Sequence, residues 1–235
     1  TGDRKILIDT GLGNKQDEKL MSHFHTHGKD NLNLSLEAQN VSVEDITDVL
    51  LTHLHFDHVG GAVAKNEFGE LIPYFPKAKY WTNKTHYEWA LNPNFREKAS
   101  FLKENFVPLN EQLVLNYIPV EQGIEFVKGI NIFFAYGHTE AMMIPHISLP
   151  NGNVLIYAAD QLPSSFHVRM PYVMSYDIRP LVTIEEKKIL FEKAIEDNHY
   201  FMFEHDPKNT IGQLTRNERG RYGINTELDW KSVVE

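Results

Sequence analysis

The stretch from residue 52 to residue 61, THLHFDHVGG, constrains this chain more than any other. The apolar residues just before it, Val49 to Leu51, predict a buried strand, and the two glycines at its end allow a sharp turn. Within six residues it places four side chains that can bind metal ions: His53, His55, Asp57 and His58. Alternate residues of an extended segment share a face, so we expect the first three to point the same way and His58 to follow at a bend. Imidazole and carboxylate groups suit zinc-like ions, and the stretch therefore predicts a metal site at the end of a strand.

The composition limits which other kinds of site the chain can hold. There is no cysteine among the 235 residues, which excludes disulfides, thiolate zinc sites and a cysteine nucleophile. The net charge is −9 and no basic stripe is visible, so we expect no nucleic-acid surface. No apolar run approaches the ~20 residues of a membrane span. The length suits a single domain over residues 1–235 that buries ~70–75% of its unfolded surface.

Three more candidate ligands share one sequence context. His138, Asp160 and His205 each lie just past the end of an apolar, strand-like run. Because strand ends meet at one edge of a sheet, such distant residues can form one site with the first tract. The polar segment 14–30 also carries three histidines, His23, His25 and His27, but no apolar strand or carboxylate frames them, so we expect no metal site there.

The remaining elements follow from apolar periodicity and turn residues. We expect strands at 5–9, 78–82 and 200–203, with a hairpin tip at 68–70. Two further hairpins are predicted, one joining strands 124–127 and 130–135 and the other turning at Asn151-Gly152. Helices are predicted over 84–91 and 95–106, and a third from a capping box at Thr183 to about Asn198.

The pattern H-x-H-x-D-H followed by Gly-Gly, and then by His, Asp and His at strand ends, resembles the metallo-β-lactamase-fold hydrolase superfamily. The resemblance runs from Ile8-Asp9-Thr10-Gly11 to His205. The intervals of 22 residues from His138 to Asp160 and 45 from there to His205 are similar to those of its lactonase and methyl-parathion-hydrolase-like (phosphotriesterase) branches. The resemblance implies an α+β fold, a four-layer αββα sandwich of two mixed sheets face to face with helices outside. Family members usually carry strands before residue 5, so one interpretation is that the chain lacks N-terminal strands.

The resemblance also implies roles for the candidate ligands. One divalent metal ion is held by His53, His55 and His138, a second by Asp57, His58 and His205, and Asp160 bridges the two. Zinc is the default, and iron, manganese or cobalt would suit the same ligands. Two such ions hold a bridging hydroxide that attacks the substrate, while Asp57 passes a proton to the leaving group. Asp57 and Asp160 are therefore the predicted catalytic residues. In the family Asp9 supports the metal site, although an ordinary turn cap explains it equally well.

Two departures from the family pattern bear on the substrate. Gly-His-Thr-Pro-Gly is here Gly-His-Thr-Glu-Ala at residues 137–141, so we expect a different turn after His138. Acyl-homoserine lactonases often have a tyrosine three residues after the bridging aspartate, where this chain has Pro163. The candidates to replace that hydrogen-bond donor are Ser164, Ser165, His167 and Tyr172. Without a replacement, homoserine lactones should react more slowly than activated aryl esters and phosphotriesters.

The predicted function is a two-metal hydrolase that cleaves esters or lactones with a metal-bridging hydroxide. Phosphotriester hydrolysis is the alternative on the same site, and a metal-stabilised interaction domain is the non-enzymatic alternative. The expected partner is a small molecule with an apolar portion, for which residues 166–176 supply either a pocket wall or core packing. Nucleic acid and a membrane span are not expected, and a homodimer and the cellular compartment stay open.

Overall fold

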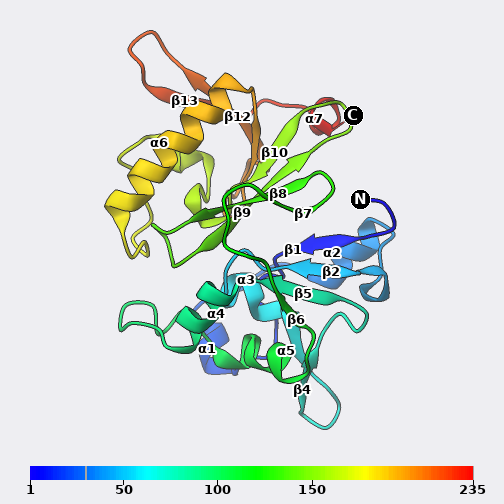
Figure 1. The fold of residues 1–235 in the computed structure, drawn as a ribbon. Coiled ribbons are helices and arrows are strands. Elements are labelled where there is room, and N and C mark those ends of the chain that lie inside the picture. Colours follow the sequence, from blue (N-terminus) through cyan, green and yellow to red (C-terminus); the bar gives the residue numbers. More distant parts are fainter. Residues whose placement is uncertain (30, 235) are drawn as a thin grey trace. The chain divides into compact units, whose positions relative to one another are not determined.

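The computed structural model describes residues 1–29 and 31–234, so the last residue of the polar segment 14–30 lies outside the described part. It forms two compact units, Thr1–Ile118 and Pro119–Glu235, each of which has its own sheet and helices (Figure 1). Each unit is described by itself below, and a single domain over 1–235 stays a prediction. Within the described residues no helix combines the length and the apolar character needed to cross a membrane.

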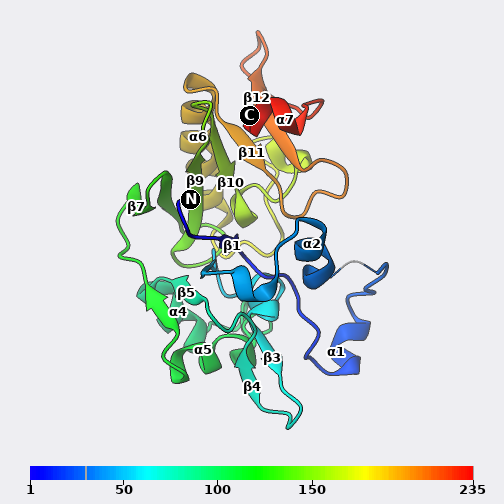
Figure 2. The same cartoon turned by 90° about the vertical axis from the view of Figure 1, so that its right-hand side faces the viewer.

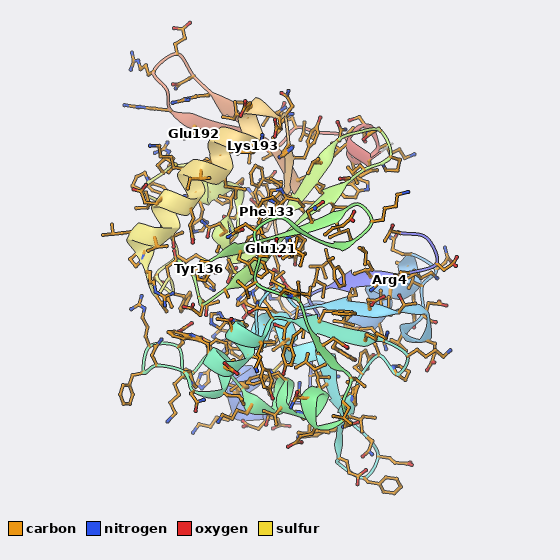
Figure 3. All side chains as sticks on the ribbon, viewed as in Figure 1. Arg4, Glu121, Phe133, Tyr136, Glu192 and Lys193 are labelled. Atoms are coloured by element: carbon orange, nitrogen blue, oxygen red, sulfur yellow. The ribbon has the colours of Figure 1, made fainter. Side chains whose placement is uncertain are left out.

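The first unit is built on a parallel sheet of four strands in the order β1-β2-β5-β6. The strands are β1 (Ile6–Ile8), β2 (Asp48–Leu50), β5 (Lys79–Thr82) and β6 (Leu115–Tyr117). Leu7 pairs with Val49, and Val49 pairs with Tyr80, so β2 lies in the middle of the sheet. At its start the Arg4 guanidinium (labelled in Figure 3) donates two hydrogen bonds to Asp48, of 2.8 and 2.5 Å. Strand β2 is the buried strand predicted before the histidine tract.

Short helices and one hairpin complete the first unit (Figure 2). The helices are α1 (Glu18–Ser22), α2 (Leu32–Ala38), α3 (Phe56–Val59), α4 (Lys84–Leu91) and α5 (Val107–Glu111), and the hairpin joins β3 (Val63–Lys65) to β4 (Leu71–Pro73). Three single 3₁₀ turns lie at Val43–Asp45, Gly60–Ala62 and Lys103–Asn105. Tyr87 of α4 and Leu109 of α5 pack with Val49 and Tyr80 of the sheet in one buried core. The core thus fixes the sheet against α4 and α5.

The helix predicted over 95–106 is wrong, whereas the one over 84–91 is confirmed as α4. Residues 95–100 form turns, and one 3₁₀ turn follows at Lys103–Asn105. The Asn94 side chain accepts hydrogen bonds from the backbone N–H groups of Arg96 and Glu97, which offers the chain an alternative to helix. The backbone N–H of Phe56 donates to the carbonyl of Ser100, so this segment is also held by the histidine tract.

The second unit contains a seven-stranded sheet in the order β13-β12-β11-β10-β9-β8-β7. Its strands are β7 (Ile124–Val127), β8 (Ile130–Ala135), β9 (Met142–Ser148), β10 (Val154–Tyr157), β11 (Tyr200–Met202), β12 (Ile211–Arg216) and β13 (Tyr222–Asn225). Only β10 and β11 pair in parallel, and the other neighbours are antiparallel. The expectation of mixed sheets is therefore confirmed here and wrong for the wholly parallel sheet of the first unit. Both predicted hairpins, β7–β8 and β9–β10, are present.

Helix α6 (Pro180–Glu196) runs along the sheet of the second unit (Figure 1), and a short helix α7 (Trp230–Val234) lies near the end of the chain. Phe191 of α6 packs against Phe201 of β11 and Tyr222 of β13, with ring centroids 6.0 and 5.3 Å apart. The helix begins three residues earlier than its predicted capping box at Thr183, because Pro180 is favourable at the first helical position. Two further 3₁₀ turns, Ala159–Gln161 and Ser165–Val168, follow β10.

Candidate metal centre

The histidine tract of the first unit starts in a loop after β2 and ends in a helix. His53 follows the strand, His55 caps the N-terminus of α3, and α3 itself carries Asp57 and His58. The expectation of one extended segment through Asp57 is therefore wrong. The carbonyl of His55 accepts hydrogen bonds from the N–H groups of His58 and Val59, which closes a helical turn where the strand pattern predicted an extended chain.

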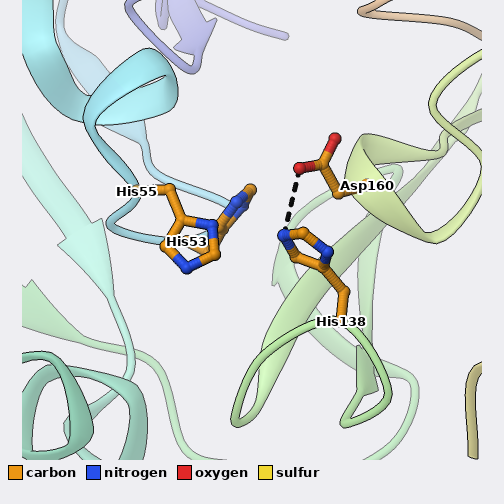
Figure 4. Close-up of side chains that lie close together, drawn as sticks. All are labelled: His53, His55, His138 and Asp160. Carbon is orange, nitrogen blue, oxygen red and sulfur yellow. Dashed lines mark ion pairs between the residues drawn. The ribbon is translucent and has the colours of Figure 1, made fainter. Parts of the chain in front are cut away.

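This turn brings the predicted ligands of the first unit close together. The ring centroids of His53 and His58 are 3.8 Å apart, and those of His53 and His55 are 4.6 Å apart (Figure 4 shows His53 and His55). All three rings are buried, whereas the Asp57 side chain is 38% exposed. Three buried imidazoles beside a carboxylate form a set of nitrogen and oxygen donors that suits a zinc-like ion.

Asp9, which directly follows β1, fixes two residues of the tract. One carboxylate oxygen accepts the backbone N–H of Thr52 at 2.8 Å. The other accepts the Thr52 hydroxyl at 2.7 Å and lies 3.0 Å from Nδ1 of His58. Of the two interpretations of this aspartate, these contacts favour support of a ligand over a simple turn cap. With Nδ1 held by Asp9, the Nε2 atom of His58 is the one available to a metal ion.

The two glycines after the tract serve close packing as well as turning. A Cβ atom on Gly60 would overlap the carbonyl of Leu12, and one on Gly61 would overlap the carbonyl of Thr10. The loop after β1 therefore packs directly on the backbone that follows the ligands. Its Thr10 N–H donates to the carbonyl of His58 at 2.7 Å. Glycine is required at these positions for contact between two loops.

In the second unit Asp160 lies between two histidines. One of its carboxylate oxygens is 3.0 Å from Nε2 of His138 (dashed in Figure 4), and the other is 3.1 Å from Nε2 of His205. His138 and Asp160 are buried, and the His205 side chain is 35% exposed. Each oxygen of one carboxylate thus faces a different imidazole. Asp160, His138 and His205 therefore offer carboxylate oxygens and imidazole nitrogens that could hold metal ions.

Asp177 holds the far side of the His138 ring. Its carboxylate lies 2.9 Å from Nδ1 of His138, which directs Nε2 towards Asp160. Burial alone would lower the pKa of His138, but the contacts with Asp160 and Asp177 outweigh it and raise the pKa to about 9. The carboxylates therefore favour positive charge at this position, which a bound cation would supply. Asp177 belongs to no sequence motif, because it lies 39 residues from its partner in an irregular segment.

The loop that carries His138 is fixed by the start of α6. A Cβ atom on Gly137 would overlap Thr183 of the helix. The Glu186 carboxylate accepts the backbone N–H groups of Tyr136 (labelled in Figure 3) and Gly137 at 2.7 and 3.1 Å, so it holds this loop instead of closing a capping box. Ala141, where the family pattern has glycine, is buried and has a φ of 49°, a left-handed conformation that favours glycine.

Residues 164–177, here called the strap, run from the neighbourhood of His205 to that of His138. The Ser165 hydroxyl and N–H donate to Asp206, and Asp177 at the other end contacts His138. Pro163, just before the strap, accepts the backbone N–H of His205 at 2.9 Å. Three of the aromatic side chains proposed as wall or core are exposed: Phe166 by 62%, Tyr172 by 49% and Tyr176 by 68%. Core packing does not account for these three rings.

Two buried residues near the first tract, His86 and Glu97, belong to none of the sequence motifs. His86 is fully buried, and its Nε2 accepts the backbone N–H of Leu54 at 2.8 Å. Glu97, which no motif includes, is 2% exposed and lies 3.5 Å from Nε2 of His55. Only their burial, which sequence periodicity did not predict, identifies them.

Residues 1–181 match the family model of the metallo-beta-lactamase superfamily. The chain belongs to the metallo-β-lactamase superfamily. Its fold is the metallo-β-lactamase fold, and the predicted α+β sandwich class is confirmed. A probable metal-dependent hydrolase from Staphylococcus aureus has a TM-score of 0.82 and 25% identity, over 97% of this chain and 80% of that one.

Two lactonases are similar to most of the chain. N-acyl homoserine lactonase AiiA from Bacillus thuringiensis subsp. kurstaki is 25% identical over 218 residues, which are 88% of this chain and 78% of the relative. The structure of AidC, a dizinc quorum-quenching lactonase in complex with a product, has a TM-score of 0.78 and 22% identity, over 97% of this chain and 77% of AidC.

Proposed function

We propose that this member of the superfamily is a two-metal hydrolase that opens lactones of small molecules with an apolar portion. The observation that carries the proposal is the position of Asp160, whose two oxygens lie 3.0 and 3.1 Å from two different histidines. The relatives named N-acyl homoserine lactonases, and the similar structure of AidC, a dizinc quorum-quenching lactonase, support the choice of lactones.

We assign one metal ion to His53, His55 and His138, and the second to Asp57, His58 and His205, with Asp160 bridging. The assignment rests on the order of these residues in the superfamily pattern and on the second contact of each ring. His53 contacts the Thr52 hydroxyl through Nδ1, and His58 and His138 contact aspartates through the same atom. Ligand histidines in metal sites are oriented in this way by the ring nitrogen that does not bind the ion.

When bound, the two ions supply a water of lowered pKa and polarise the carbonyl oxygen of the substrate. Zinc is the metal that we propose first for these nitrogen and oxygen donors, and iron, manganese or cobalt would fit the same set. Residues of the chain itself carry out the proton transfer. Asp57 has a side chain that is 38% exposed, in contrast to the buried histidines, so it is placed to carry a proton between the site and the leaving oxygen.

His167 is the residue that we propose in place of the tyrosine missing at Pro163. Of the four candidates, Ser165 is committed to Asp206, and the Ser164 hydroxyl lies 2.8 Å from Nδ1 of His167. Burial, followed by the charge of Lys187, lowers the pKa of His167, so its ring is neutral at pH 7. His167 lies two residues after Ser165, whose N–H and hydroxyl donate to Asp206, the residue after His205. A neutral imidazole held at Nδ1 can donate from Nε2 to a substrate carbonyl.

The strap supplies the apolar surface for the rest of the substrate. Phe166, Tyr172 and Tyr176 are exposed on a segment that is fixed at both ends beside ligand residues. Arg169 is the one cation within the strap, so this segment suits a neutral or weakly charged ligand better than a polyanion.

Metal analysis together with a substrate panel tests the proposal. The purified protein should retain about two divalent ions per chain, and the loaded protein should hydrolyse an N-acyl homoserine lactone, measured beside a p-nitrophenyl ester, a dialkyl aryl phosphate and a cephalosporin. Loaded protein that hydrolyses none of them would instead support a metal-stabilised interaction domain. Faster turnover of the aryl phosphate than of every lactone would favour the phosphotriesterase alternative.

The variant His167→Phe tests the proposed donor. We expect kcat on lactones to fall by about 10²-fold, the usual effect of removing one oxyanion donor, and to fall much less on the activated aryl ester. An equal loss on both substrates, or no loss, would remove His167 from the role. In the latter case Tyr172, whose phenol is 49% exposed, is the next variant to measure.

A further inference from the structure

The buried carboxylate of Glu97 faces the ring of His55 in the first unit. Glu97 is 2% exposed, and one of its oxygens lies 3.5 Å from Nε2 of His55. That separation is within ion-pair reach and a few tenths of an ångström longer than a usual N–H···O hydrogen bond. An ionised side chain is almost never buried without partners, so the contacts of this carboxylate are informative.

The second oxygen of Glu97 is held by two neutral donors. Trp89 of α4 donates its indole N–H at 2.8 Å, and Asn94 donates its side-chain amide at 2.6 Å. Both bonds are made to the same oxygen, and the other oxygen is the one that lies 3.5 Å from Nε2 of His55. The carboxylate is therefore oriented before any ion binds, and it presents an acceptor to Nε2.

The backbone around Glu97 is tied to the same part of the tract. Ser100 accepts the N–H of Phe56, the residue after His55. The Phe101 ring packs against the His55 ring with centroids 4.7 Å apart. The segment that carries Glu97 thus contacts both the backbone next to His55 and the His55 ring itself. A shift of Glu97 away from His55 would require this packing to change.

We propose that Glu97 is a positioning residue that keeps the Nε2 proton on His55 and so directs Nδ1 of this ring to the metal ion. The inference rests on the metal site of the proposed function. His58 and His138 contact carboxylates through Nδ1 and present Nε2 to an ion. Under this proposal His55 uses the two nitrogens the other way round, with Nε2 towards the carboxylate and Nδ1 towards the ion. A carboxylate that accepts the distal N–H of a ligand histidine fixes the tautomer, orients the ring and makes it a stronger donor to the metal.

Glu97→Gln is the sharpest variant because it keeps the shape and removes the second acceptor oxygen. One end of the new amide must be an NH₂ group. If that group faces His55, it favours the wrong tautomer, and if it faces the other way it meets the N–H groups of Trp89 and Asn94. We expect affinity for the ion assigned to His53, His55 and His138 to fall 10–100-fold, as measured by zinc competition with a chelator.

Glu88→Gln is the matched control, since Glu88 lies on α4, is 64% exposed and pairs only loosely with Lys84 at 3.8 Å. It should retain both ions with wild-type affinity. Trp89→Phe removes one of the two donors that orient Glu97 and should weaken zinc by less than Glu97→Gln does. Circular dichroism and thermal unfolding of each variant establish that a loss of metal is not a loss of fold.

Nitrogen NMR of the zinc-loaded wild-type protein tests the same inference without any variant. It should show His55 protonated at Nε2 and metal-bound at Nδ1, with His58 and His138 of the opposite pattern. A His55 ring bound through Nε2, or a Glu97→Gln protein that holds both ions with wild-type affinity, would overturn the role of Glu97. Wild-type protein that binds no metal would instead defeat the proposed function, so the two failures are distinguishable.

Discussion

Lys187 of α6 holds the strap in place, and its replacement by methionine is expected to affect both stability and substrate binding. The side chain is 1% exposed, and its ammonium donates to the carbonyls of His167, Arg169 and Tyr172 at 2.7, 3.2 and 2.7 Å. All three protons of the ammonium are thus used within six residues of the strap. Lys187→Met keeps most of the apolar stem and removes every one of these donors.

The magnitude at pH 7 is a difference between two opposing effects. Hydrogen bonds from a charged donor contribute about 1.5–3 kcal/mol each, so the loss of three costs roughly 5–9 kcal/mol. Burial lowers the pKa of Lys187 from 10.5 to about 8, although Asp177 opposes this shift. Removal of the buried charge relieves this unfavourable burial and so stabilises the fold by about 3 kcal/mol. We therefore expect Lys187→Met to lower the free energy of unfolding by about 2–6 kcal/mol.

The pH dependence has a defined sign. Between pH 8 and pH 10.5 the folded protein has lost the Lys187 proton and the unfolded chain still binds it, so the wild-type protein becomes more stable as pH rises. Below pH 8 both states are protonated and this contribution is constant. By pH 10 the difference in stability between wild type and Lys187→Met should exceed its pH 7 value by about 2–3 kcal/mol.

Urea unfolding at pH 7, 8, 9 and 10 measures both quantities, with Lys188→Met as the control because Lys188 is the exposed neighbour on the same helix. The control should follow the wild type at every pH. In steady-state assays the loosened strap should raise KM for lactones with apolar chains more than it lowers kcat. A Lys187→Met protein as stable as wild type at pH 7, with no divergence by pH 10, would refute the reasoning.

Three other outcomes follow from the site. Asp57→Ala or His58→Ala should abolish most turnover and release mainly one metal ion, whereas His53→Ala should release mainly the other. Metal content measured beside activity tests this, and full activity in metal-free His53→Ala protein would contradict the mechanism. Gly137→Ala should cost about 1–3 kcal/mol in urea unfolding, because its Cβ overlaps Thr183, and unchanged stability would refute that overlap. Across lactones of increasing acyl length, kcat/KM should rise about fourfold per methylene over the first few carbons, since each buried methylene contributes about 0.8 kcal/mol; a flat series would show that the strap does not bind the chain.

The sequence predicted the strands and hairpins well because their signals are local. Asn151-Gly152 marks the turn between β9 and β10, and the apolar run before His53 marks β2. The ligand tract was recognisable because its side chains lie within six residues. Its local geometry was not, since a helical turn closed by the carbonyl of His55 replaces the expected extended segment.

The residues that orient the ligands were harder to predict because they are distant in the chain. Glu97 lies 42 residues after His55, and Asp177 lies 39 residues after His138. Neither belongs to a recognisable pattern, and Glu97 falls in a stretch whose spacing predicted a helix. Asp9 was identified only through the family resemblance, because Asp before Thr-Gly is ordinary turn chemistry. Such partners are selected by tertiary contact, which periodicity and spacing do not encode.

Three buried carboxylates, Asp9, Glu97 and Asp177, each face one ring nitrogen of a predicted ligand within their own unit. Burying a carboxylate is unfavourable, and an apolar residue of similar volume would often give a more stable fold. Their presence is therefore better explained by what they do to the imidazoles than by stability. Each one fixes which nitrogen carries a proton and which is presented to an ion. The orientation of the ligands is thus set separately inside each unit, by contacts that exist before an ion binds. The free energy needed to order those rings is therefore spent during folding and not during metal binding.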